Sequence, residues 1–169
     1  MDVFKAIRTR IEVRQYSERA VPSEVKRQIL EAARLSPSGM NTQHWRFILI
    51  DSKDDIKKLA DLSTTGKWVS GADFGIIVLT DPKYRFHQID AGRAITHMQL
   101  AAWENGVGSC IYVGINDEGM RLAFGIPESL EITAVVGFGY PAKPVRGRKR
   151  RIEIEKIAFQ KRYGQVLDI

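Results

Sequence analysis

The sequence has little cysteine and no long apolar run. Cys110 is the only cysteine in 169 residues, so no disulfide can form within the chain and a reducing compartment is the natural setting. The best apolar stretch, "FGIIVLT" at 74–80, is far shorter than the roughly 20 residues that span a bilayer. The opening "MDVFKAIRTR" lacks the apolar core of a secretory signal. We therefore expect a cytoplasmic protein without membrane association.

The sequence also lacks the motifs of a self-sufficient catalyst. His44, His87, His97 and Cys110 show no metal-ligand spacing, and each is expected to be structural. There is no Gly-x-Ser-x-Gly elbow, no P-loop and no Gly-x-Gly-x-x-Gly after a first strand. Cys110 stands in an apolar stretch, away from a charged base. If the protein is an enzyme, we expect a cofactor to supply the chemistry.

Positive charge is concentrated in one place. The net charge is +6, and residues 143–151, "KPVRGRKRR", hold six basic residues and no acidic one. The remainder of the chain balances at 20 basic and 20 acidic residues. Such a cluster indicates a localised anion, with phosphate as the first candidate. A solvated basic loop or a nucleic-acid-binding tail explains the same cluster, and the segment alone does not decide between them.

Hydrophobic periodicity predicts one domain, residues 1–169, in which helices and strands alternate. Asp2, Ser23 and Ser52 with Asp55 are the expected helix caps. The end of the chain lacks clear helical spacing, and we expect it to be an extended arm that packs on another surface. Helices are expected at 3–11, 23–36, 52–62, 84–105 and 116–124, strands at 46–50, 73–80, 109–115 and 131–139, and the arm at 152–169.

The stretch "PSGMNTQHW" at 37–45 is unusual for a turn. It carries four side chains that can form hydrogen bonds, and it ends in an aromatic residue before the apolar "RFILI". A turn that only reverses the chain does not need them. We expect Trp45 to be a core anchor, and the question is what ligand, if any, the polar side chains face; these are Ser38, Asn41, Gln43 and His44.

Four stretches together resemble the nitroreductase family of FMN-dependent oxidoreductases. They are "TRIEVRQY", "AARLSPSGMNTQHWRFILI", "NGVGSCIYVG" and "GFGYPAKP" followed by basic residues, and their order and spacing match along nearly the whole chain. The resemblance implies an α+β fold with a central, mostly antiparallel sheet flanked by helices. It also implies a homodimer with FMN at the subunit interface.

The resemblance further implies roles for particular residues. Two basic residues near each end of the chain would hold the FMN phosphate and ribityl chain, and the proline–serine block would reach the flavin from the partner subunit. A lysine would lie against the N1 and O2 edge, and a backbone N–H would point at flavin N5. The matching positions are Arg10, Arg14, Arg148 and Arg150; Pro37, Ser38, Gly39 and Asn41; Lys67; and Val113 or a neighbour.

Three departures from the family pattern affect these expectations. Glu12 stands where the family usually has serine, and it would repel the phosphate unless it pairs with Arg10 or the basic run. His44 replaces the usual proline before Trp45. The chain leaves no room for the helical insertion that covers the pocket in larger members, so the substrate site should be open.

The expected activity is hydride transfer from NADH or NADPH, through FMN, to nitroaromatic, quinone or flavin-type acceptors with ping-pong kinetics. The arm at 152–169 would pack on the partner subunit, and no nucleic-acid partner is expected. Dehalogenation, dehydrogenation or oxygen-dependent chemistry on the same FMN fold remains open. A basic nucleic-acid-binding module and a flavin-storage protein are the alternatives from other classes.

Overall fold

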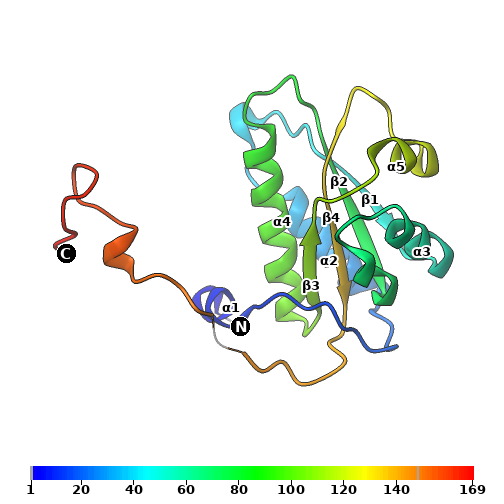
Figure 1. The fold of residues 1–169 in the computed structure, drawn as a ribbon, viewed down its shortest axis with the longest axis horizontal. Helices are drawn as coiled ribbons and strands as arrows, with labels where there is room; N and C mark the ends of the chain where they lie inside the picture. Colours follow the sequence, from blue (N-terminus) through cyan, green and yellow to red (C-terminus); the bar gives the residue numbers. More distant parts are fainter. Residues whose placement is uncertain (1, 148) are drawn as a thin grey trace.

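The computed structural model describes residues 2–147 and 149–169, and Figure 1 shows their arrangement. Its centre is an antiparallel sheet of four strands in the order β1-β2-β4-β3. The expected α+β class with a mostly antiparallel sheet is confirmed. The strands are β1 (Arg46–Ile50), β2 (Phe74–Thr80), β3 (Gly108–Tyr112) and β4 (Glu131–Gly139).

Helices cover both faces of this sheet. One apolar cluster joins α2 and α4 to one face, and a second joins α3, η2 and α5 to the other. Because side chains alternate along a strand, β2 serves both clusters, with Phe74, Ile76 and Val78 on one face and Ile77 and Leu79 on the other. The helices are α1 (Val3–Thr9), α2 (Ser23–Arg34), α3 (Lys53–Asp61), α4 (His87–Glu104), α5 (Asp117–Phe124) and the 3₁₀ helices η1 (Gly39–Asn41), η2 (Lys67–Gly71) and η3 (Ile154–Lys156).

Local capping explains most helix starts. The Asp2 side chain accepts from Lys5 N, and the Ser52 side chain accepts from Asp55 N, as predicted. The prediction for Ser23 was wrong, because Pro22 occupies the cap position and Ser23 is the first helical residue. Proline fixes φ close to the −57° found at this position, and the helix begins without a side-chain cap hydrogen bond.

The last residues leave the body of the protein. Figure 1 shows the chain after β4 passing beneath the sheet and continuing beyond α1 as an arm. Most of its large apolar side chains are exposed, and η3 is its one short helical turn among the described residues. These side chains are Ile152, Ile154, Ile157, Tyr163 and Val166. No described helix has the length and apolar character needed to cross a membrane.

Candidate functional site

Residues 10–14 run beside β3 as an extended segment. Val13 N donates to Ser109 O at 3.0 Å, and Glu12 forms a parallel bridge with Ser109. Val13 is buried. Because side chains alternate in extended backbone, Arg10, Glu12 and Arg14 share the side opposite Val13. The edge of β3 therefore places two arginines and a carboxylate in one row.

Close packing holds this segment against the sheet. A Cβ on Gly108 would lie 2.7 Å from the Val13 side chain, so glycine is needed for the approach. The Tyr16 hydroxyl donates to Val13 O at 2.6 Å and lies 3.2 Å from Gly137 O. Burial, chiefly, raises the pKa of Tyr16 above its usual value, so this hydroxyl remains a donor.

Glu12 forms an ion pair with Arg10. Arg10 Nη1 donates to Glu12 Oε1 at 2.7 Å, with side-chain exposures of 21% and 32%. This pair reduces the repulsion that Glu12 would exert on a phosphate. The carboxylate also neighbours Cys110, contrary to our expectation that no charged base lies near this thiol. Burial and then a hydrogen bond to Glu12 raise the pKa of Cys110 to about 12, so the thiol stays protonated.

The chain after β4 forms a basic strap beside this row; we use that name for residues 141–147 and 149–151. Its start pairs with the N-terminal segment, because Ala142 N donates to Gln15 O at 3.0 Å and Ser17 N donates to Tyr140 O at 2.8 Å. Farther along, the Lys149 ammonium donates to Ile7 O. The strap therefore follows residues 7–17 over most of its length.

Two hollows open between the strap and residues 10–15. The first, of about 460 Å³, we call the Arg10 hollow; it is lined by Arg10, Ile11, Glu12, Gly147, Lys149, Arg150 and Arg151. The second, of about 340 Å³, we call the Arg14 hollow; it is lined by Ile11, Glu12, Val13, Arg14, Gln15, Pro141, Lys143, Val145 and Arg146. The two share only Ile11 and Glu12.

The Arg10 hollow has the electrostatics of an anion site. Burial, followed by the charges of Arg10 and Arg151, lowers the pKa of Lys149. These cations therefore repel one another, and Glu12 is the one acidic side chain in the lining. A bound anion would relieve the repulsion. The charge of this hollow fits a phosphate group.

Lys67 and Val113 lie at the other end of β3. Thr64 N donates to Gly114 O at 2.8 Å, and a Cβ on Gly66 would lie 2.4 Å from the Tyr112 ring, so residues 64–67 pack on 112–114. Lys67 is exposed, and Val113 is 68% exposed. Val113 lies four residues beyond Ser109, or about 13 Å along the strand.

The loop at 37–45 is held by one buried carboxylate. Asp90 Oδ2 accepts from Gly39 N at 2.9 Å and lies 3.2 Å from His44 Nε2. Asp81 N donates to His44 Nδ1 at 3.4 Å, so Nε2 carries the proton and donates to Asp90. The side chains of His44 and Asp90 are 2% and 1% exposed. His44 therefore points into the protein, where it anchors the loop and does not face a ligand, and Trp45 is buried as predicted.

This anchored loop has an uncommon backbone. Met40, Asn41 and Gln43 have φ values of 50°, 53° and 47°, which side chains with a Cβ adopt rarely. Ser38 Oγ accepts from Gln43 N at 3.0 Å, which closes the turn. Such strain is found mostly at functional sites, where the surroundings enforce it. Pro37, Met40 and Asn41 are exposed.

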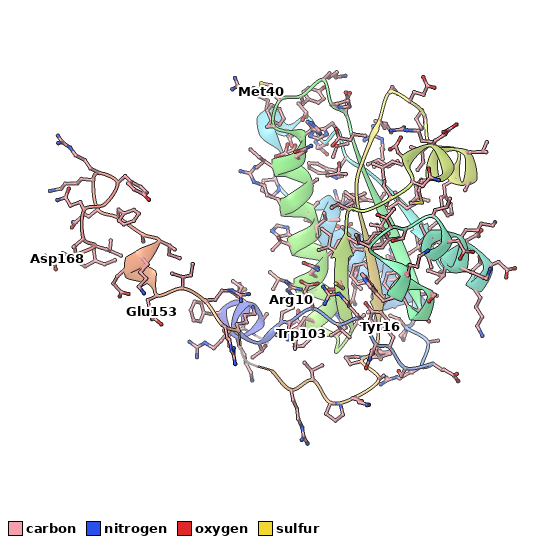
Figure 2. All side chains as sticks on the ribbon, in the orientation of Figure 1. Arg10, Tyr16, Met40, Trp103, Glu153 and Asp168 are labelled. Carbon is pink, nitrogen blue, oxygen red and sulfur yellow. The ribbon has the colours of Figure 1, made fainter. Side chains whose placement is uncertain are left out.

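A single chain does not bring the loop to the Arg10 hollow. The Trp103 indole donates to Thr9 Oγ1 at 3.0 Å, so α1 and Arg10 lie at the C-terminal end of α4. Figure 2 places Met40 at the opposite end of that helix. With 18 residues, α4 is about 27 Å long.

The expected site residues therefore fall into three groups. Arg10 and Arg150 share one hollow, and Arg14 lines the next. Lys67 and Val113 lie together, and Pro37, Ser38, Gly39 and Asn41 form a separate loop. Arg148 lies outside the described residues. The hollows also contain four residues of the basic run that had no individual role in the expected site, Lys143, Arg146, Lys149 and Arg151. The sequence gave no signal that Asp90 anchors the loop, since the partners of Asp90 are distant in sequence.

Among the described residues no cluster could hold a metal ion.

Comparison with known proteins gives the class. The nitroreductase family profile matches residues 7–82 and 63–140. A candidate NADH dehydrogenase/NAD(P)H nitroreductase of Archaeoglobus fulgidus is 34% identical over 83% of this chain and 86% of its own. A protein of the same description from Methanothermobacter thermautotrophicus is 34% identical over 85% and 79%.

A solved structure agrees with these sequence matches. The crystal structure of a candidate nitroreductase in complex with FMN, from Desulfovibrio desulfuricans, superposes with a TM-score of 0.84 at 31% identity. The superposition covers 96% of this chain and 98% of the other. The chain belongs to the nitroreductase family.

The buried anchor predicts a large stability effect at His44. His44→Ala removes a donor from the buried Asp90 carboxylate and leaves a cavity, so the free energy of unfolding should fall by about 2–4 kcal/mol. His97→Ala is the matched control, because the His97 side chain makes no hydrogen bond among the described residues. Urea denaturation measures both; equal losses in the two variants would contradict the anchoring role.

Proposed function

We propose that the protein is an FMN-dependent oxidoreductase that uses NADH or NADPH to reduce nitroaromatic, quinone or flavin-type acceptors. The observation that carries the proposal is the Arg10 hollow, where cations gather around the Arg10–Glu12 pair in a chain of the nitroreductase family. Relatives named for NAD(P)H nitroreductase activity and an FMN complex in a similar structure support it.

Arg10 and Arg150 would hold the FMN phosphate, since arginine forms charge-assisted, often bidentate, hydrogen bonds with phosphate oxygens. Arg148 remains a further expected contributor. Arg14, next along the row, would face the ribityl chain. When bound, FMN supplies the hydride and electron transfer that the side chains of this protein cannot. We assign no catalytic acid or base.

At the far end of β3, Lys67 would place a positive charge against the N1 and O2 edge of the flavin, and Val113 N–H would donate to N5. The exposure of both residues, and the packing of 64–67 on 112–114, supports this assignment. A cation at that edge favours the reduced flavin, which carries negative charge there. A site without a cation at this edge would not favour the reduced flavin in this way.

A homodimer would complete the site. The length of α4 separates the 37–45 loop from Arg10 and exceeds the length of an FMN molecule. Pro37, Ser38, Gly39 and Asn41 would therefore contact the flavin bound by the partner subunit. Exposed apolar side chains on α1 (Phe4, 66% exposed) and on the 152–169 arm would supply the interface. We also assign the protein to the cytoplasm, on its single cysteine.

The hypothesis that the basic strap binds a nucleic acid accounts for fewer features of the structure. Its basic residues are not interleaved with aromatic side chains, and nucleic-acid binding gives no role to the strained 37–45 loop. The competing hypotheses therefore make different predictions for flavin binding.

Arg10→Gln with Arg150→Gln should weaken FMN binding by roughly 2–4 kcal/mol, from about 1.5–3 kcal/mol per charged hydrogen bond with a discount for exposure. The change also leaves Glu12 without its partner. Riboflavin, which has no phosphate, should bind the native protein and the variant about equally. Titrations followed by flavin fluorescence at one salt concentration measure both ligands.

Lys53→Gln with Lys57→Gln is the control for that titration, because it removes the same charge from the exposed face of α3. It should leave FMN affinity unchanged. Unchanged FMN affinity in the Arg10 and Arg150 variant, with weaker binding of a short duplex and a shallower salt dependence, would instead favour the nucleic-acid hypothesis.

The native protein should be a dimer at micromolar concentration, since obligate interfaces of this kind bury more than about 2,000 Å². Ile154→Asp with Ile157→Asp should weaken the dimer and lower FMN occupancy. Leu122→Asp is the control, because Leu122 is 88% exposed on α5. Light scattering that finds a flavin-bound native monomer would exclude the shared site.

One site serving two substrates in turn predicts ping-pong kinetics. Double-reciprocal plots against the nicotinamide nucleotide at several acceptor concentrations should be parallel. Steady-state assays with a quinone acceptor supply the data. Converging lines would mean that both substrates bind together, and the shared-site mechanism would then be incorrect.

A further inference from the structure

Lys143 and Arg146 give the Arg14 hollow positive charge that the proposed FMN site does not use. Arg14, Lys143 and Arg146 are exposed in its lining, and none has an ion-pair or hydrogen-bond partner within residues 2–147 and 149–169. The neighbouring Arg10 is already paired with Glu12. Three cations without ion-pair partners surround one concavity whose acidic residue, Glu12, is paired with Arg10, so the hollow has a positive potential that attracts an anion.

Glu12 separates this hollow from the Arg10 hollow. It is the only acidic residue in either lining, and it belongs to both. A single anionic group that straddled Glu12 would be repelled by its carboxylate. Two anionic groups, one on each side of Glu12, would each meet mainly cations. The arrangement therefore suits two phosphates, whereas FMN carries one.

We propose that the Arg14 hollow binds a phosphate monoester, the 2′-phosphate of NADPH, through Lys143 and Arg146; this inference rests on the proposed function. Of the substrates in that reaction, nitroaromatic compounds and quinones carry no phosphate, and a flavin-type acceptor carries one only when it is a nucleotide, whereas the nicotinamide nucleotide is needed with every acceptor. NADPH differs from NADH only by this group, which is close to a dianion at neutral pH. The protein accordingly uses NADPH in preference to NADH.

Arg14 strengthens the potential of the hollow, but it also lies in the row assigned to the ribityl chain. The test variant therefore changes only Lys143→Gln and Arg146→Gln, two exposed positions on the strap without partners among the described residues. Lys53→Gln with Lys57→Gln on α3 again supplies an equal change of charge elsewhere.

The experiment titrates NADP⁺ and NAD⁺ into the three proteins, with and without FMN, by calorimetry at one salt concentration. Native protein should bind NADP⁺ at least about tenfold more tightly than NAD⁺, or about 1.4 kcal/mol. The ratio of the NADP⁺ affinity to the NAD⁺ affinity should approach one in the Lys143 and Arg146 variant and should stay at its native value in the α3 control. FMN affinity should be the same in all three.

Equal affinities for NADP⁺ and NAD⁺ in the native protein would overturn the inference. The inference would also be overturned if the Lys143 and Arg146 variant bound both nucleotides more weakly by the same factor, since that result would assign the hollow to the diphosphate that they share. A tenfold preference that survives the variant would also refute it. Failure of the native protein to bind FMN, with the NADP⁺ preference intact, would overturn the proposed function and leave this inference standing.

Discussion

The pairing of residues 12 and 13 with Ser109 at the outer edge of β3 is the contact on which the site depends. Val13 enters the core there because Gly108 has no Cβ, and the Tyr16 hydroxyl fixes the next turn of backbone. The alternation of an extended chain then sets Arg10, Glu12 and Arg14 in one row. The strap pairs with residues 15–17 and follows that row, so both hollows depend on this edge.

Local patterns predicted the elements, because each depends on residues close in sequence. The Ser52 and Asp55 cap, the continuous apolar run of β2 and the apolar stripe of α2 are of this kind. The order β1-β2-β4-β3 carries no local signal and was not predicted; the family resemblance implied only that the sheet is mostly antiparallel. The Asp90 anchor and the Glu12 contact with Cys110 join residues far apart in the chain. Glu12 looked unfavourable for phosphate only while its ion pair with Arg10 was unknown.

The structure of the 37–45 loop explains in part why this turn carries a tryptophan and four polar side chains. Its buried side is explained by Trp45, the His44–Asp90 pair and the approach of Gly39 to Phe86, where a Cβ would lie 2.6 Å from the ring. Its exposed side has no structural role in a single chain. Because α4 separates the loop from the basic hollows, a second subunit is the simplest source of a ligand contact. The strained backbone, the apolar α1 surface and the arm agree with that arrangement.

The central claim is that the protein binds FMN and that a nicotinamide nucleotide reduces it. The most direct test is the visible absorbance spectrum of the purified protein after loading with FMN and removal of free flavin. The account predicts a protein-bound flavin spectrum that bleaches under argon when NADH or NADPH is added and returns with a quinone. A protein that retains no FMN, or whose bound flavin neither nucleotide bleaches, would contradict it.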